Sequence, residues 1–220
     1  MHRRKSSRVI KIRIPACLGL PAALLFGLSA CTTSIPIETS IPTPLIAPLP
    51  NRVAVYYDPG LSNFEHTEKI VGGTDYQVKL GDANQRMFAK LFTSMFEEVV
   101  QVDSLEQAFS DARGFDAIIN PAITELQIAP PSKLESAFFE AWIKYRIDAF
   151  DKDRKPIVNW VVTGYGKAEP EMFNSSDALR AATVTAMRDA AANIVIKFKR
   201  QPRVREWIQE QERLHAAPSE

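Results

Sequence analysis

Hydrophobic and polar positions alternate from residue 52 onward, in two periods that separate strands from helices. Val53, Val55 and Tyr57 recur at every second position and predict a first strand over residues 52–58. With turns such as Gly72-Gly73 between segments, the same period predicts further strands over residues 75–80, 99–102, 115–128, 141–150 and 157–167. A period near 3.6 predicts helices over residues 82–96, 104–113 and 176–199.

Three local features sharpen these predictions. Asp82, followed three residues later by Gln85, forms a capping-box pattern at the start of the first helix. Pro121 falls inside a strand, where it cannot donate to a neighbour, which indicates an edge position or a bulge. In residues 141–150 the apolar side chains share one face, and Trp142 falls on the other face among charged residues.

The order of elements is β-(β)-α-β-α-β-β-β-α. A helix crosses over between early strands, a meander follows, and a long helix comes last. This order predicts an α+β fold: a mixed β-sheet with helices packed mainly on one face. The last helix carries small residues that let it lie close to the sheet, namely Ala182, Ala186, Ala190 and Ala191.

The first thirty residues have the layout of a secretory signal. An apolar stretch from Ala16 to Leu28 follows a basic segment and is shorter than the roughly 20 residues of a membrane-spanning helix. The basic segment contains no acidic residue and six basic ones: Arg3, Arg4, Lys5, Arg8, Lys11 and Arg13.

The signal ends in Leu28-Ser29-Ala30-Cys31, which resembles the lipobox of bacterial lipoproteins. The resemblance implies cleavage between Ala30 and Cys31 and a diacylglyceryl group on the Cys31 thiol, with an acyl chain such as palmitate on the new amino terminus. Several acyl chains together give stable anchoring in a bilayer. The alternative is a cleaved secretory signal followed by a chance cysteine.

Processing also changes the charge of the chain. The formal net charge of +1 becomes negative once the basic segment leaves, because all 26 acidic residues remain. A nucleic-acid partner is therefore not expected. Thr32 stands where enteric-type lipoproteins retained in the inner membrane carry Asp, which favours the periplasmic face of the outer membrane.

Residues 31–51 are predicted to hold the lipid and to form a proline-rich tether. Five prolines prevent a helix and favour an extended conformation that could lift the domain off the membrane. The alternative is that the aliphatic side chains of this segment pack on the domain or on a neighbouring subunit; these are Ile41, Leu45, Ile46 and Leu49.

The globular part is predicted to be one domain over residues 52–200, followed by a charged helical tail over residues 201–220. Trp207 and Ile208 in the tail could dock on a neighbour or on the parent domain. The mature chain has no cysteine besides Cys31, so neither a disulfide nor a thiolate metal site is expected.

Motifs for catalysis are missing from the sequence. Beyond the signal the histidines are His66 and His215, and neither a His-Glu-x-x-His pair nor a Gly-x-Ser-x-Gly elbow is found. Gly164-Tyr165-Gly166 indicates a bulge or close packing. The acids around residues 148–153 are interleaved with Lys and Arg, which favours a solvated turn over calcium ligation. No enzyme activity, cofactor or metal is therefore expected.

Tryptophans mark the predicted interaction surface. Trp142 lies among charged residues on a strand, and Trp160 lies on the strand that pairs with it. Exposed aromatic side chains among charges are frequent at interfaces. The alternative is that Trp142 and Trp160 form a cross-strand pair covered by Arg or Lys. Trp207 completes the set.

A family resemblance adds to this picture. The segments RVAVYYD, LGDANQRMFAKLFTSMFEEVVQVDS and ARGFDAIINPAITELQI, in the order described, resemble the periplasmic domain shared by the amino-terminal part of TolB, CsgG and PelC. This resemblance covers about residues 52–199 and implies a non-catalytic building block of an envelope machine, often ring-forming. No functional residue of that family transfers to this chain.

Together these features predict a non-enzymatic outer-membrane lipoprotein that acts as a scaffold or accessory subunit in envelope assembly or export. Its expected partners are the membrane, an envelope protein and possible further copies of itself. The alternative is a periplasmic carrier lipoprotein for a lipid or small ligand, similar to the LPS-assembly lipoprotein LptE. A third reading is a cell-wall hydrolase.

Overall fold

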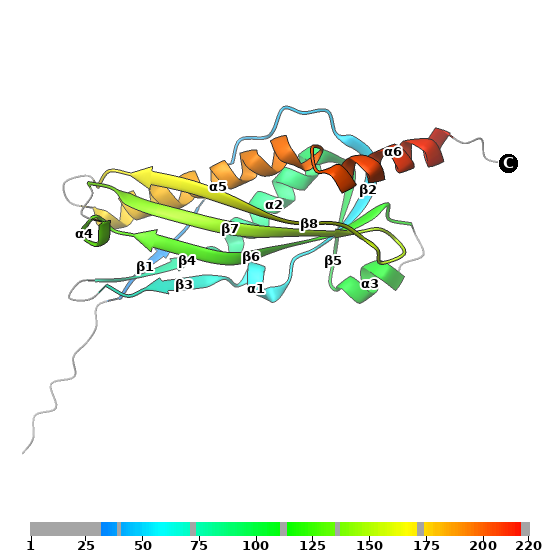
Figure 1. The fold of residues 1–220 in the computed structure, drawn as a ribbon. Coiled ribbons are helices and arrows are strands. Elements are labelled where there is room, and N and C mark those ends of the chain that lie inside the picture. The colour runs from blue at the N-terminus through cyan, green and yellow to red at the C-terminus, as the bar shows by residue number, and fades with distance from the viewer. Residues whose placement is uncertain are drawn as a thin grey trace, which may run out of the picture.

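The fold combines two β-sheets with a layer of helices. The computed structural model describes residues 32–38, 41–70, 74–110, 114–134, 137–170 and 174–216 (Figure 1). The predicted signal peptide, Ala30, Cys31 and Gly72-Gly73 lie outside these residues.

The larger sheet has five strands in the order β5-β2-β6-β7-β8. Its pairings are parallel from β5 through β2 to β6 and antiparallel from β6 through β7 to β8, so the sheet is mixed. The strand bounds are β2 (Leu49–Tyr56), β5 (Phe96–Val102), β6 (Ala117–Ala129), β7 (Phe139–Phe150) and β8 (Pro156–Ala168). The predicted α+β class is confirmed.

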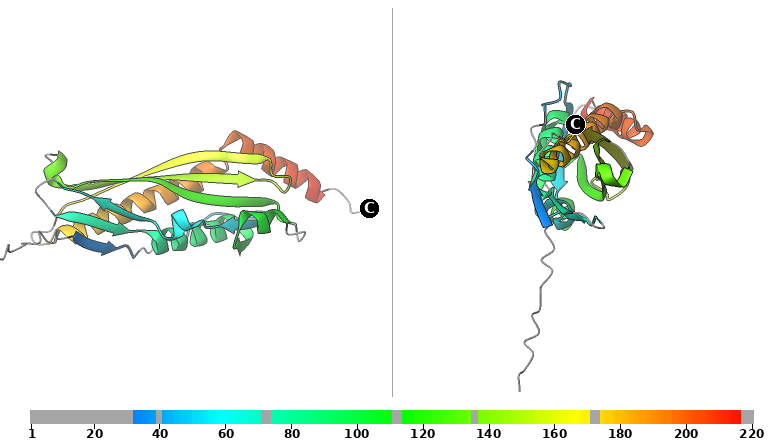
Figure 2. Two further views of the ribbon diagram at one scale, coloured as in Figure 1. Left: turned by 90° about the horizontal axis from the view of Figure 1, so that it is seen from below. Right: turned by 90° about the vertical axis from the view of Figure 1, so that its left-hand side faces the viewer.

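Two helices cover one face of this sheet, called here the inner face. They are α2 (Gly81–Met95) and α5 (Ser175–Phe198); α5 runs along β7 and β8, and the shorter α2 lies beside it (Figure 2). The predicted apolar side of β7 is buried here, and the ring centroids of Tyr145 and Phe88 lie 5.2 Å apart, edge to face. Asn84 is fully buried beside them, and its Oδ1 accepts a 2.6 Å hydrogen bond from the Tyr145 hydroxyl.

The predicted close packing of the last helix on the sheet is present between α5 and β8. A Cβ on Gly164 would stand 2.1 Å from the carbonyl oxygen of Ala186, and one on Gly166 would stand 2.1 Å from that of Ala182. Helix and strand backbones therefore touch at Gly164-Tyr165-Gly166, which is close packing and not a bulge in the ladder.

A second, three-stranded sheet has the order β1-β4-β3, with β1 (Thr32–Pro36) parallel to β4 (Asp75–Lys79) and β3 (Glu65–Glu68) antiparallel to it. The sequence predicted β4, but it predicted a single sheet and no strand in the proline-rich segment. The short helix α1 (Pro59–Ser62) connects the two sheets and is capped by the Asp58 side chain.

The proline-rich segment differs most from its prediction as a tether. Ile35 and Ile37 are buried in and just after β1, and Ile41 and Leu49 are buried further along. The alternative expectation, packing on the domain, describes Ile41, Ile46 and Leu49, whereas Leu45 is 99% exposed. The prolines do keep the chain out of a helix, but burial of these aliphatic side chains holds it against the domain.

Two smaller expectations are also settled. Asp82 does not cap α2, because the capping position is Leu80 and no side-chain cap is made there; Asp82 lies exposed in the first turn. Pro121 does lie at a local edge, because β2 pairs with β6 only through residues 117–119 and the ladder on that side ends before Pro121.

Helices also lie outside the layer of α2 and α5. α3 (Leu105–Ser110) packs on the opposite side of the larger sheet, where Ala108 joins Ala54, Ile118 and Phe115 in a second small core. α4 (Pro131–Leu134) follows β6, and α6 (Pro202–Ala216) packs against β8 at the end of the chain. None of the helices within the described part of the chain is both long and apolar enough to span a bilayer.

Raising the pH above about 10 is expected to destabilise the fold. Burial raises the pKa of Tyr57 and of Tyr145 above the ordinary value of 10.0. The folded protein keeps these two protons while the unfolded chain loses them, so the free energy of unfolding should fall by about 1.4 kcal/mol per pH unit for each tyrosine above pH 10. Their contribution is fully present at neutral pH.

Urea unfolding between pH 8 and pH 11 measures this dependence. Tyr145→Phe should remove about half of the loss because one of the two protons is then missing from both states. An unchanged slope in that variant would contradict the assignment.

Candidate interaction surfaces

The side of β6, β7 and β8 that points away from α2 and α5 is the outer face. Its side chains follow the strand register, in which Trp142 stands opposite Gln127 on one side and Tyr165 on the other. The residues of the outer face are Glu125, Gln127, Glu140, Trp142, Lys144, Arg146, Asp148, Asn159, Val161, Thr163, Tyr165 and Lys167. No helix lies over the middle of this face in the views of the described elements (Figures 1 and 2).

An aromatic pair stands near one end of the outer face. The ring centroids of Trp142 and Tyr165 are 5.4 Å apart with the planes tilted by 39°. The Tyr165 hydroxyl donates a 3.0 Å hydrogen bond to Glu140 Oε2. Desolvation beside Trp142, together with the hydrogen bond and negative charge of Glu140, raises the pKa of the Tyr165 phenol. Tyr165 therefore stays a neutral donor at physiological pH.

Four charged residues of the outer face form two ion pairs. Lys144 bonds Glu125 across the β6–β7 register and holds the pKa of that carboxyl below its usual range. Arg146 Nε lies 2.8 Å from Asp148 Oδ2. These exposed pairs contribute little to stability. Their consequence is that the face is polar, with its paired charges compensating one another.

The predicted tryptophans do not form one surface. Trp160 stands opposite Ile147 on the inner face and is half-buried against the main core, so it is separated from Trp142 by the sheet itself. The expected cross-strand pair of Trp142 and Trp160 is therefore wrong, and Tyr165 takes the place beside Trp142. The sequence did carry a signal for the face of Trp160. Trp160 lies two residues from both Val158 and Val162, which are buried, and alternate residues of a strand share a face.

Trp207 docks on the parent domain, which was one of the two expected positions; the other was a neighbouring molecule. It is 8% exposed on α6, and Val204 of the same helix is fully buried. Trp207 Nε1 is buried and has no hydrogen-bond partner among the described residues. An unpaired donor of this kind costs roughly 1–3 kcal/mol, so α6 is held by its apolar contacts.

A hollow of about 640 Å³ opens between α6 and the β7–β8 turn. Acids and bases alternate along it, and the turn acid Asp151 accepts hydrogen bonds from the backbone N–H groups of Asp153 and Lys155, each 2.9 Å long. Asp151 is thus occupied by the turn. Within the ranges that the structure describes, no three His, Cys, Asp or Glu side chains gather as a metal site would require.

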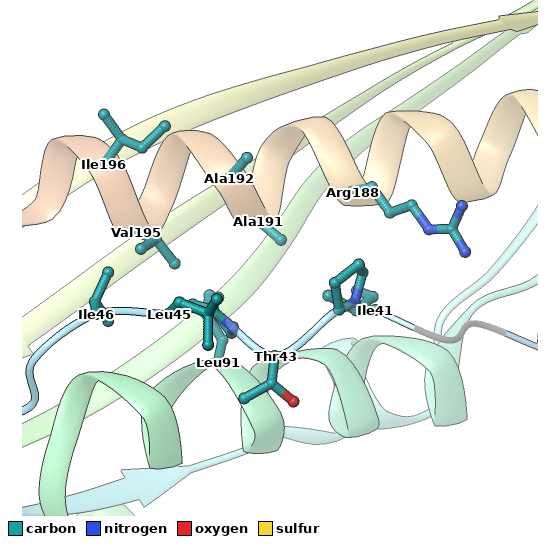
Figure 3. Close-up of a pocket in the computed structure, with 12 residues that line it drawn as sticks. Ile41, Thr43, Leu45, Ile46, Leu91, Arg188, Ala191, Ala192, Val195 and Ile196 are labelled. Carbon is teal, nitrogen blue, oxygen red and sulfur yellow. The ribbon is translucent and has the colours of Figure 1, made fainter.

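A groove lies on the far side of the helical layer from the larger sheet. Residues 41–46 run between α2 and α5 and leave an open groove of about 340 Å³ beside the last turns of α5 (Figure 3). It is bounded by Ile41, Leu45 and Ile46 from the proline-rich segment, Leu91 from α2, and Arg188, Ala191, Ala192, Val195 and Ile196 from α5. Leu45 and Ile196 are 99% and 54% exposed.

The chain matches no protein-family model and no curated protein, whereas solved structures do match it. A Xanthomonas campestris protein described by the DUF330 family model is 9% identical, with a TM-score of 0.52 over 84% of this chain and 99% of that chain. The two proteins share a fold. At this identity the likeness extends to the fold alone.

Two further structures are more distant. A Helicobacter pylori homologue of a neuraminyllactose-binding hemagglutinin is 11% identical, with a TM-score of 0.46 over 80% of this chain and 100% of that chain. The PelC dodecamer of Paraburkholderia phytofirmans is 17% identical, with a TM-score of 0.33 over 69% of this chain and 95% of that chain. Both lie below the level at which a shared fold can be inferred, and the resemblance to TolB and CsgG stays a prediction.

Proposed function

We propose that this protein is a non-enzymatic lipoprotein of the outer membrane, anchored on the periplasmic face by lipid on Cys31. It acts as a scaffold or accessory subunit in envelope assembly or export, through protein–protein contact and self-association. The anchor follows from the lipobox-like sequence before Cys31. The proposed contact surface is supported by the open outer face.

The open outer face is the observation that carries this proposal. A sheet face that no described helix covers normally presents polar side chains to water, yet this one also holds Trp142, Tyr165 and the 51% exposed Val161. Aromatic residues are enriched at the energetically important centres of interfaces, and paired charges suit the polar rim around them. An open face with internally paired charges fits a protein surface better than a small ligand.

A second copy of the chain is the partner that this surface fits first. The face carries acidic and basic side chains in similar numbers, so a copy related by a twofold axis can set Glu against Lys or Arg. The basic members are Lys144, Arg146 and Lys167, and the acidic members are Glu125, Glu140 and Asp148. A face of one sign would repel its own copy.

The carrier and hydrolase alternatives have less support. A carrier was expected to hold a lipid in an enclosed apolar cavity between helices and sheet, whereas the groove described above is open and lies outside the helical layer. A hydrolase was expected to bring carboxylates together in a cleft, and the acids in the hollow beside α6 are interleaved with Lys152, Lys155 and Arg203.

Replacement of Val161 by Asp is expected to dissociate the oligomer. The carboxylate would be buried unpaired at the contact, which costs several kcal/mol and corresponds to at least about a hundredfold weaker association. Light scattering after size exclusion measures the mass of the lipidated protein and of the mature chain carrying Cys31→Ser. Leu214→Asp is the matched control, because Leu214 is similarly exposed, at 56%, but lies on α6.

A strict monomer in both the lipidated and the Cys31→Ser protein would rule out self-association. An oligomer whose mass is unchanged by Val161→Asp would show that the contact between copies does not lie on the outer face.

A further inference from the structure

An exposed apolar patch surrounds the groove on the helical side of the molecule. Leu45 lies on the segment between α2 and α5, and Ile196 projects from the last turns of α5 on the side away from this segment in Figure 3; both residues line the groove and are exposed. The patch comprises Pro42, Pro44, Leu45, Ala192, Val195 and Ile196, and is called here the leucine patch. Leu45 is 99% exposed and contributes nothing to the folded core, and it lines the same groove as the exposed Ile196, so the two belong to one apolar patch.

The segment that carries Leu45 is held firmly at both ends. Lys90 Nζ donates a 2.5 Å hydrogen bond to the carbonyl oxygen of Ile41, and Lys199 Nζ donates a 3.1 Å hydrogen bond to that of Ala47. Ile41 and Leu49 are buried on either side. Prolines at 42, 44 and 48 restrict the backbone between these points. Leu45 is therefore presented on a stiff support, which lowers the entropy lost when it is buried by a partner.

The charge around the leucine patch is positive. Arg188 is the one charged residue among the described residues that line the groove, and no carboxylate lines it. Lys90 and Lys199 lie at the two ends of the segment that carries Leu45, where they donate hydrogen bonds to the carbonyl oxygens of Ile41 and Ala47. Lys197 in the last turn of α5 and Arg200 just after the helix are further exposed cations near this end of α5. An apolar surface rimmed by Lys and Arg complements a lipid interface that bears anionic headgroups.

We propose that the leucine patch docks on the surface of an anionic phospholipid bilayer. Leu45 and Ile196 would enter the boundary between headgroups and acyl chains, and the cations would face lipid phosphates. This inference rests on the proposed lipid anchor. β1 begins at Thr32, the residue after Cys31, so the folded domain starts with no intervening spacer and a bilayer is always within reach.

Such docking would leave the outer face available to proteins. The leucine patch lies on one side of the layer formed by α2 and α5, and the larger sheet lies on the other side (Figure 3). Bilayer contact on the first side therefore directs Trp142 and Tyr165 toward the periplasm.

Vesicle co-sedimentation of the mature chain carrying Cys31→Ser tests this proposal without the contribution of the anchor. The chain is expected to pellet with vesicles of phosphatidylethanolamine and phosphatidylglycerol in a 3:1 ratio, and more weakly with phosphatidylcholine alone. Binding should weaken as salt screens the cations. Leu45→Asp with Ile196→Asp should reduce the binding constant by at least about a hundredfold, since each side chain contributes roughly tenfold.

Leu214→Asp with Gln209→Asp is the matched control, because it adds the same two charges at exposed positions of α6, outside both proposed surfaces, and should bind the vesicles like the parent chain. Both altered side chains of the leucine patch are exposed, so circular dichroism should show an unchanged fold. Absence of binding to the anionic vesicles, or equal binding by the double variant, would overturn the proposal. So would phospholipid that leaves the vesicles and co-elutes with the soluble chain, which would identify a carrier. None of these outcomes bears on the oligomer measured through Val161→Asp, so the two proposals fail separately.

Discussion

Gly164→Ala is expected to lower the free energy of unfolding by about 3 kcal/mol, at the upper end of the usual cost of overpacking. The new Cβ would stand 2.1 Å from the Ala186 carbonyl oxygen and 2.7 Å from the Ala190 Cβ. The first obstacle is helix backbone, which cannot rotate aside as a side chain can. Relief requires α5 to move away from β8 along a contact that includes Gly166 as well.

Thermal and urea unfolding measure this effect. A loss of about 3 kcal/mol corresponds to a fall in the melting temperature of about 6–12 °C for a chain of this size. Thr163→Ala is the control, since Thr163 neighbours Gly164 on the exposed side of β8 and should be nearly neutral. A Gly164→Ala protein as stable as the parent would mean that α5 and β8 are not in backbone contact.

Tyr145→Phe is expected to cost about 2 kcal/mol although it removes a single oxygen atom. The Tyr145 hydroxyl is the donor that the structure gives to Asn84 Oδ1, and both residues are fully buried. Asn84 Nδ2 points instead to the carbonyl oxygen of Leu61, 3.5 Å away. The amide oxygen would then be left without a partner in the core, and the cost of an unpaired buried acceptor exceeds that of a lost exposed hydrogen bond.

The same change at Tyr165 provides the comparison. Its hydroxyl bonds Glu140 at the surface, where water can replace it, so Tyr165→Phe should change stability by less than about 0.5 kcal/mol. A double-mutant cycle with Asn84→Ala should show that the two core variants together cost less than the sum of the two alone. Additive losses would indicate that the Tyr145–Asn84 bond does not form.

Local periodicity was sufficient to predict much of the larger sheet and its helices. The two-residue alternation of residues 141–150 anticipated which side of β7 is buried, and the small residues of α5 anticipated its close approach to β8. Both are properties of a single segment. Pro121 was also interpretable because proline alone cannot donate to a neighbouring strand.

Features that depend on distant segments were missed. β1 pairs with β4, which lies more than forty residues further along the chain. The segment around β1 shows no alternation that would predict a strand, because it holds prolines and isolated aliphatic side chains. The partner of Trp142 depends on the register of the β7–β8 hairpin, in which Trp142 stands opposite Tyr165. Spacing along one strand gives the face of a side chain but not the register, so Tyr165 could not be identified from spacing alone.

The position of β1 also determines how the domain would respond to mechanical load. The proposed lipid on Cys31 would transmit tension into the folded domain at Thr32, the first residue of a strand that lies parallel to β4. When the pull runs along the strand axis, the hydrogen bonds between β1 and β4 are loaded in shear and must break together. Ile35 must leave the core in the same event. The lipid would therefore hold the domain through a mechanically resistant joint, with no slack chain to extend before the joint bears the force.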